Sequence, residues 1–307
     1  GVTLSVVARG ETLLQLQAHG LQLHNGDQTQ FAKVQASAQP ATLGIQDLVI
    51  IAVKAPSMPD VAKQIQALIG PNTIVMTAMN GVPWWFLQGF GGAYANTPLK
   101  SVDPHGQIAT AIPAQHLIGC VVHASCSLRA PGQVQHHFGN GLIIGEPAGG
   151  SSARVQALHQ LLRDAGFEAT LSERIQKDVW YKLWGNMTIN PISALTGATS
   201  DKILNDPNLL SFVSAVMLEA KAIGAAMGIA IDQQPEDRHV VTRKLGAFKT
   251  SMLQDVQAKR AVELDALVGA VQELGQITGV PTPFTDALMG LARLQAQELG
   301  LYPVSPA

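Results

Sequence analysis

A lysine and two asparagines at four-residue intervals are the side chains best suited to chemistry in this sequence. Lys182, Asn186 and Asn190 fall in an otherwise apolar and aromatic stretch. At about 100° per residue, each step of four drifts by only about 40°, so a helix would place all three on one face. An ammonium in apolar surroundings has a lowered pKa and can act as a general acid. A solvent-facing polar stripe that ends at Asn190-Pro191 would show the same spacing.

Three further polar residues each follow an apolar, strand-like run. They are Arg9 after Val2–Ala8, Lys54 after Asp47–Val53 and Asn80 after Thr73–Met79. Such strand ends form the ligand-binding edge of open α/β sheets, and an arginine there suits the 2′-phosphate of NADP. Together Arg9 and Lys54 favour NADP(H), although either alone could be a solvated charge. Asn80 could face a nicotinamide ribose and a substrate, or simply form a turn with Gly81.

A serine and a glutamate belong to a predicted helix from Thr250 to Gly279. Ser251 with Gln254 matches the S-x-x-Q capping box, so a structural role would explain it. A hydroxyl at a helix N-terminus could equally bind a carboxylate. Glu263 would lie about 120° around that helix from Ser251, so periodicity does not join the two in one site.

The elements that would position these residues alternate between strand and helix up to residue 173. The apolar runs have the pattern of parallel strands covered on both faces, and Met58 to Ile69 has the pattern of a crossover helix. Leu117 to Pro147 alternates around turns, which suggests appended antiparallel strands. We therefore predict an α/β fold with a Rossmann-type doubly wound sheet over residues 1–173.

Strand signals vanish after residue 173. Long amphipathic segments follow at Ile175–Asn190, Pro207–Gly228 and Thr250–Gly279. They predict an all-helical C-terminal domain over residues 174–307. The cleft is expected between the carboxyl edge of the sheet and this helical domain.

Composition excludes several classes of function. The chain has 307 residues, 14% charged residues and a net charge of -2, so nucleic acid is not an expected partner. No segment looks long and apolar enough to span a bilayer and no signal peptide is evident, so we expect no membrane partner and a cytoplasmic location. Cys120 and Cys126 suit packed thiols. The histidines lack metal-ligand spacing, and there is no G-x-S-x-G elbow, so neither a metal site nor a serine hydrolase is predicted.

Five segments resemble the ketopantoate reductase (2-dehydropantoate 2-reductase) family. They are VVARG (6–10), VIIAVKAPS (49–57), AMNGVPWW (78–85), KLWGNMTINPISALTG (182–197) and TSMLQDVQAKRAVELD (250–265). The similarity runs nearly end to end. The lysine-asparagine helix and the SMLQD segment are its most specific parts.

The resemblance implies a role for each candidate residue. It makes Lys182 the general acid. It implies that the substrate is held by Asn80, Asn186, Asn190 and Ser251, and that NADP(H) is met by Arg9, Lys54, Asn80, the backbone near Ser125, and Glu263. Where some members have a further substrate-binding asparagine this chain has Ser200, which we carry over as a substrate contact. That difference leaves the exact substrate open.

The implied reaction is the NADPH-dependent reduction of 2-dehydropantoate to (R)-pantoate, a step of pantothenate biosynthesis. A reductase of another small 2-oxo acid and a non-catalytic NADP-binding regulatory protein are the alternatives, and a homodimer is compatible with the sequence. Family members begin with a strand, a G-x-G-x-x-G turn and a helix that holds the pyrophosphate. This chain begins at what should be the second strand, so we expect that first unit to precede the sequence given.

Overall fold

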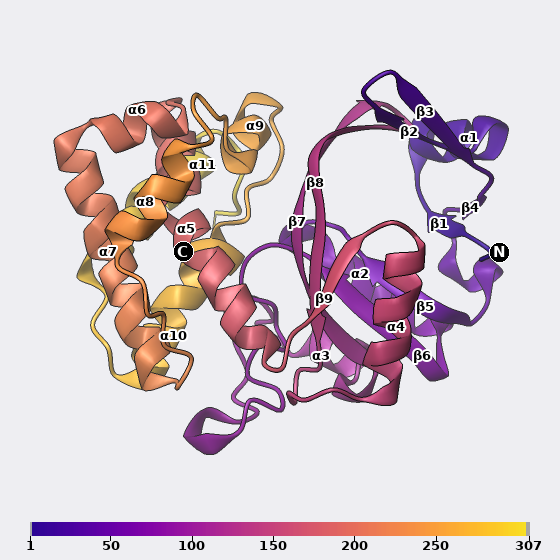
Figure 1. Ribbon diagram of the computed structural model, residues 1–307, viewed down its shortest axis with the longest axis horizontal. Helices are drawn as coiled ribbons and strands as arrows, with labels where there is room; N and C mark the ends of the chain where they lie inside the picture. The colour runs from indigo at the N-terminus through magenta and orange to yellow at the C-terminus, as the bar shows by residue number, and fades with distance from the viewer. Residues whose placement is uncertain (1, 305–307) are drawn as a thin grey trace.

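The chain forms a part built on β-sheet and a part built only of helices, which lie side by side (Figure 1). The computed structural model describes residues 2–304. The last strand ends at Leu171, and every later described element from Ile175 onward is helical. The predicted α/β class with a helical C-terminal region is therefore confirmed.

The larger sheet has seven strands, in the order β3-β2-β8-β7-β6-β5 with β9 beside β8. Their bounds are β2 Leu21–Asn25, β3 Gln28–Ala32, β5 Gln46–Ile51, β6 Ile69–Ala78, β7 Leu117–Ala130, β8 Gln133–Gly145 and β9 Glu168–Leu171. β5, β6 and β7 are parallel neighbours, whereas β7 and β8 are antiparallel. Because parallel strands end at the same edge of a sheet, Lys54 after β5 and Asn80 after β6 emerge on one side.

A second sheet is formed by β1 (Ser5–Val7) and β4 (Gln35–Ser37), which run parallel to each other. Within the described residues these two strands are not hydrogen-bonded to the larger sheet, so the predicted doubly wound sheet is present in two parts. Arg9 lies just after β1 and stands at the N-cap position of α1 (Gly10–His19).

Three helices accompany the larger sheet. α2 (Met58–Ile65) is the crossover between β5 and β6, α3 (Gln107–Ala111) precedes β7, and α4 (Ala153–Asp164) connects β8 to β9. The pattern of Met58 to Ile69 predicted this crossover helix; in the structure α2 ends at Ile65, a 3-10 turn covers Gln66–Leu68 and Ile69 begins β6.

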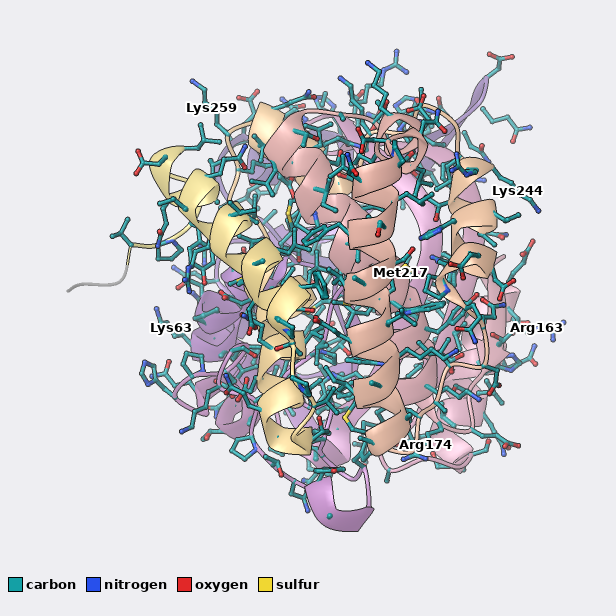
Figure 2. The ribbon with its side chains drawn as sticks, turned by 90° about the vertical axis from the view of Figure 1, so that its left-hand side faces the viewer. Lys63, Arg163, Arg174, Met217, Lys244 and Lys259 are labelled. Carbon is teal, nitrogen blue, oxygen red and sulfur yellow. The ribbon has the colours of Figure 1, made fainter. Side chains whose placement is uncertain are left out.

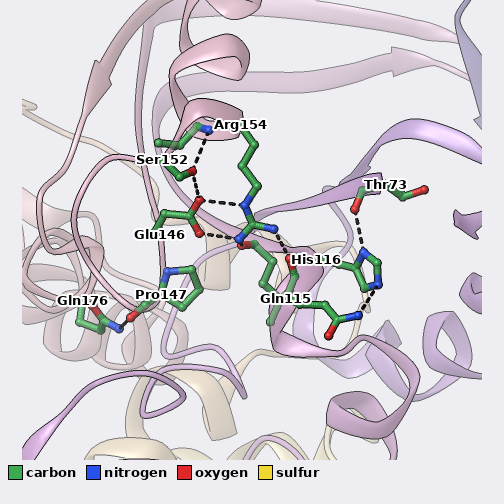
Figure 3. Close-up of polar contacts among 10 residues, drawn as sticks. Thr73, Gln115, His116, Glu146, Pro147, Ser152, Arg154 and Gln176 are labelled. Carbon is green, nitrogen blue, oxygen red and sulfur yellow. Dashed lines mark hydrogen bonds and ion pairs between the residues drawn. The ribbon is translucent and has the colours of Figure 1, made fainter. Parts of the chain in front are cut away.

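An ion pair between the half-buried Arg154 and the buried Glu146 ties α4 to the sheet (Figure 3). Arg154 donates from Nε to Glu146 at 2.8 Å, from Nη2 to the other Glu146 oxygen at 2.5 Å and to the carbonyl of Leu117 at 3.1 Å, and from Nη1 to the carbonyl of Gln115. Burial raises the pKa of Glu146, but hydrogen bonds from Arg154 and Ser152 outweigh burial and hold it below its ordinary value. Every nitrogen of this guanidinium therefore has an acceptor.

Helix α5 is the centre of the helical part. The helices are α5 Ile175–Thr196, α6 Ser200–Asn205, α7 Pro207–Ala226, α8 Pro235–Arg243, α9 Ser251–Gln257, a π-helical turn Asp265–Gly269, α10 Ala270–Thr278 and α11 Pro283–Glu298. Trp180, Leu183 and Trp184 on α5 are buried among its neighbours. The helix continues through Pro191, so the lysine-asparagine stretch is one uninterrupted helical segment.

The predicted single helix from Thr250 to Gly279 is wrong. α9 ends at Gln257, Lys259 has φ +53°, and helical structure resumes with the π-helical turn at Asp265. The break is held by Asp255, because its carboxylate accepts from Arg260 Nε at 3.0 Å and its carbonyl accepts the Arg260 N–H at 2.9 Å. Ser251 and Glu263 therefore do not share a helix.

Helix α7 corrects the expectation that no segment is apolar and long enough to span a bilayer. Its 20 residues meet that criterion by length and composition, with 33% of the apolar window buried. It carries the buried side chains Val213, Val216, Met217 and Ala220, and Figure 2 shows it beside α11 with Met217 labelled. Because α7 packs against α5, α10 and α11, core packing accounts for its buried apolar side chains.

Candidate active site

Lys182 bridges the two parts of the molecule. Its Nζ donates to Oδ1 of Asn80 at 2.6 Å and to the carbonyl of Val122 at 2.6 Å. Asn80 follows β6 and Val122 lies in β7, so a residue of α5 meets the edge of the sheet. Gly81 has φ +81°, which suits glycine, so Asn80 both begins a turn and contacts Lys182.

The surroundings of Lys182 adjust its acidity. Burial lowers the pKa of its ammonium to about 8; the Arg238 charge lowers it too, whereas Cys120 and Glu263 act in the opposite direction. Burial also raises the pKa of the Cys120 thiol to about 12, so that neighbour is neutral near pH 7. Lys182 is thus protonated at neutral pH and able to release its proton, as a general acid requires.

Asn186 and Asn190 follow Lys182 on the same continuous helix. Asn190 is buried and Asn186 is half-buried. Because α5 is unbroken between Ile175 and Thr196, the four-residue spacing places both amides on the face of Lys182. Helix geometry thus brings the three predicted residues together.

The two predicted serines differ in their surroundings. Ser251 is exposed as the first residue of α9, and the helix is capped by Thr250, whose Oγ1 accepts the Leu253 N–H at 3.2 Å. The predicted capping role of Ser251 is therefore wrong. Ser200 is 1% exposed and donates its hydroxyl to the carbonyl of Gly246 at 3.0 Å. Its hydroxyl supports the segment before α9, not an open surface as a substrate contact would require.

Lys54 is not a free cation. It pairs with Asp255 of α9, which is buried and also accepts from Arg260. The next residue, Ala55, donates its N–H to Oε1 of Glu263 at 3.0 Å. Burial raises the pKa of Glu263, opposed by that hydrogen bond and by Lys54. The end of β5 is thereby joined to residues 255–263, and the sequence analysis missed Asp255 because no local spacing marks it.

The other predicted cofactor residues lie along the sheet. Arg9 is exposed. The pKa of Asp60 on α2 is lowered chiefly by Lys63 and to a smaller extent by the charge of Arg9, so Arg9 lies within electrostatic range of α2. The β7–β8 register shifts on both sides of Ser125. Such bulges leave backbone groups outside the regular ladder, which makes them available to a ligand.

A small cavity opens beside the strand ends, lined among others by Ala55, Met79, Asn80 and Ala266. It adjoins both Asn80 and the residue that follows Lys54. Among residues 2–304, no three His, Cys, Asp or Glu side chains gather as a metal site would need. The arrangement can hold an elongated cofactor along the sheet edge and present a proton donor from α5.

A sheet whose strand ends face a half-buried lysine from a helical part has the arrangement that suits a dinucleotide-dependent oxidoreductase, because ligands bind at the carboxyl ends of the strands and a proton donor faces them. Comparison with known families agrees: the model of "Ketopantoate reductase PanE/ApbA" matches residues 1–149, and its C-terminal counterpart matches residues 174–296. The chain belongs to the ketopantoate reductase family, whose members are NAD(P)-dependent oxidoreductases acting on a 2-oxo acid.

Individual relatives support the same assignment. The 2-dehydropantoate 2-reductase of Mesorhizobium japonicum is 43% identical over 299 residues, covering 97% of this chain and 92% of that protein. A crystal structure of a candidate ketopantoate reductase from Ralstonia solanacearum MolK2 is 53% identical, with a TM-score of 0.94 over 98% of this chain and 92% of that one.

Two more distant structures share the fold. A D-mandelate dehydrogenase with NADH and anilino(oxo)acetate has a TM-score of 0.79 at 22% identity and covers 94% of this chain and 89% of that one. A ketopantoate reductase from Staphylococcus aureus, described as dimeric, has a TM-score of 0.74 at 19% identity over 97% of this chain and 100% of that one.

Proposed function

We propose that this chain reduces 2-dehydropantoate (ketopantoate) to (R)-pantoate with NADPH. The observation that carries this proposal is the half-buried Lys182, whose pKa is lowered to about 8 and whose Nζ lies 2.6 Å from Asn80 Oδ1 at the edge of the sheet. A positioned proton donor beside a nucleotide-binding edge is what the reduction of a keto group requires.

NADPH, when bound, supplies the hydride to the keto carbon. Lys182 donates its proton to the keto oxygen as negative charge develops there. Asn80 Oδ1 and the Val122 carbonyl accept hydrogen bonds from the ammonium and so orient it. Asn186 and Asn190, on the following turns of α5, hold the substrate on the same face. The exposed hydroxyl of Ser251 lies at a helix N-terminus and is suited to a carboxylate oxygen.

The cofactor is NADP(H), held at the strand ends. Arg9, which is exposed, provides positive charge for the 2′-phosphate, with Lys54 as a second cation that would share its charge between the phosphate and Asp255. The bulged backbone near Ser125 contacts the cofactor, and Glu263 meets its ribose side. The residues fit such a cofactor because an exposed arginine follows β1 and the ends of β5 and β6 lie at one edge of the sheet. The preference is tested by comparing kcat/KM for NADPH and for NADH in the wild type. Equal values would contradict recognition of the 2′-phosphate by Arg9 and Lys54.

The two domains divide this work. We assign residues 1–173 to NADP binding and residues 174–307 to substrate binding and dimerisation, in a cytoplasmic enzyme. Support for a homodimer comes from Leu218 on α7 and from Phe284, Leu291 and Leu294 on α11, which are large, apolar and exposed. Both helices lie on the face seen in Figure 2. A second copy of this face would cover such side chains.

Replacing Lys182 by Ala tests the reaction. We expect kcat to fall by about 10²–10⁴-fold with little change in NADPH affinity, because a general acid typically contributes that factor. Lys177→Ala is the matched control, since this lysine is exposed on the same helix. A kcat that stays within about threefold of wild type would contradict the role of Lys182.

A panel of 2-oxo acids distinguishes the remaining alternatives. A kcat/KM that is highest for ketopantoate supports the proposed substrate. A higher kcat/KM for another 2-oxo acid would make that acid the substrate instead. NADPH binding without any turnover would identify a non-catalytic NADP-binding protein, and the present site chemistry argues against that outcome because the proton donor is in place.

A further inference from the structure

A second cation lies beside α5 without a counter-charge. Arg238 belongs to α8, and its Cζ lies 5.4 Å from the ring centroid of Tyr181, the residue before Lys182. Its Nε is buried and has no hydrogen-bond partner, and no carboxylate within residues 2–304 forms an ion pair with it. A desolvated guanidinium nitrogen without an acceptor is costly, so a group that supplies one would be bound favourably.

Gly185 provides the place where this guanidinium lies. A Cβ added at Gly185 would come within 2.6 Å of Arg238 Nε and 2.8 Å of Nη2. Glycine inside a helix weakens the helix, so its presence in α5 needs another reason. Here it lets the guanidinium approach the α5 backbone less than one turn from Lys182.

Arg238 lies close enough to Lys182 to influence its pKa. Arg238 helps to lower the pKa of Lys182 and that of His123 on β7, although burial is the largest cause for both. The two atoms that accept hydrogen bonds from Lys182 are neutral oxygens, of Asn80 and Val122. Glu263, the carboxyl that also acts on Lys182, already accepts the Ala55 N–H. Two cations against one carboxyl group favour an anionic ligand.

We propose that Arg238 binds the carboxylate of the 2-oxo acid substrate, an assignment that rests on the proposed function. In such a substrate the carboxylate is bonded directly to the keto carbon. A guanidinium that grips it would therefore fix the keto oxygen relative to Lys182. The planar guanidinium can give two parallel hydrogen bonds to a carboxylate, whereas the Ser251 hydroxyl brings no charge.

Arg238→Met and Arg238→Lys test this assignment by steady-state kinetics. For Arg238→Met we expect the KM for ketopantoate to rise by roughly 10–100-fold, as for a lost charged hydrogen bond, with the NADPH KM unchanged and kcat within about threefold. Arg238→Lys keeps the positive charge but cannot give two parallel hydrogen bonds. Its KM should therefore lie between those of the wild type and Arg238→Met. Arg163→Met, at an exposed arginine of α4 labelled in Figure 2, should behave like wild type.

The neutral lactone of ketopantoate gives a second readout that a merely structural role would not move. The wild type should prefer the acid, and Arg238→Met should lose that preference. An unchanged KM for the acid, or an unchanged preference for acid over lactone, would overturn the assignment. Equal thermal unfolding midpoints for Arg238→Met and wild type exclude a folding defect as the cause of a raised KM.

Failure of the proposed function remains distinguishable. If the wild type reduces no 2-oxo acid, that function fails, and calorimetric titration with ketopantoate then tests Arg238 separately. Loss of binding in Arg238→Met supports its anion-binding role, and unchanged binding refutes it.

Discussion

Arg154 and Arg238 are both half-buried arginines on helices, yet the hydrogen-bonding surroundings of their guanidinium groups are opposite. Arg154 donates to both oxygens of Glu146 and to two backbone carbonyls (Figure 3). Arg238 has a buried Nε without an acceptor and lies against Gly185 and the Tyr181 ring. A guanidinium saturated by the protein stabilises the fold, whereas one left unsatisfied beside a proton donor is available to a ligand.

The largest expected difference is in stability. Arg154→Met should lower the free energy of unfolding by ~3 kcal/mol, because it leaves the buried Glu146 carboxylate without its partner. Arg238→Met leaves no carboxylate unpaired and should cost less than ~1 kcal/mol. Urea unfolding of both variants measures this. Equal losses would show that the two arginines have the same role.

A helix glycine gives a smaller effect with two readouts. Gly185→Ala should gain up to ~1 kcal/mol of intrinsic helix stability, but its Cβ would displace the guanidinium of Arg238. We therefore expect unfolding stability close to wild type and a KM for the 2-oxo acid raised by roughly 3–10-fold, part of the loss of a charged hydrogen bond.

Gly290→Ala is the matched control for this change. Gly290 lies within α11, and a Cβ there would meet nothing within 4 Å. It should gain the same helix propensity with an unchanged KM. If Gly185→Ala also left the KM unchanged, the close approach of Arg238 to α5 would have no functional consequence.

The smallest expected effect is a shift of the pH profile. In the proposed mechanism reduction requires protonated Lys182, so kcat/KM should be constant below about pH 8 and fall above it, following the lowered pKa of this lysine. Arg238 lowers that pKa, so Arg238→Met should raise it and move the fall to higher pH. Arg154→Met should keep the wild-type pH profile. A shifted profile in this variant would contradict the conclusion that the two arginines have different roles.

Local patterns were sufficient where one helix or strand contains the whole signal. Lys182, Asn186 and Asn190 share a face because α5 is continuous, and the residues after β5 and β6 emerge together because those strands are parallel. They failed where nearby residues compete for the same role. Thr250 replaces Ser251 as the cap, and Asp255 binds Arg260 where a continuous helix was predicted.

The amino-acid sequence by itself predicted the α/β and helical division and the shared face of Lys182, Asn186 and Asn190, because hydrophobic periodicity and helical spacing are local properties. Only the tertiary structure decided which charges are satisfied. Lys54 meets Asp255, Arg154 meets Glu146, and Arg238 meets the backbone of Gly185. The Lys54–Asp255 and Arg238–Gly185 contacts join segments far apart in the chain, whereas Glu146 and Arg154 lie only eight residues apart, after β8 and in α4. Sequence spacing therefore did not distinguish a saturated cation from an available one.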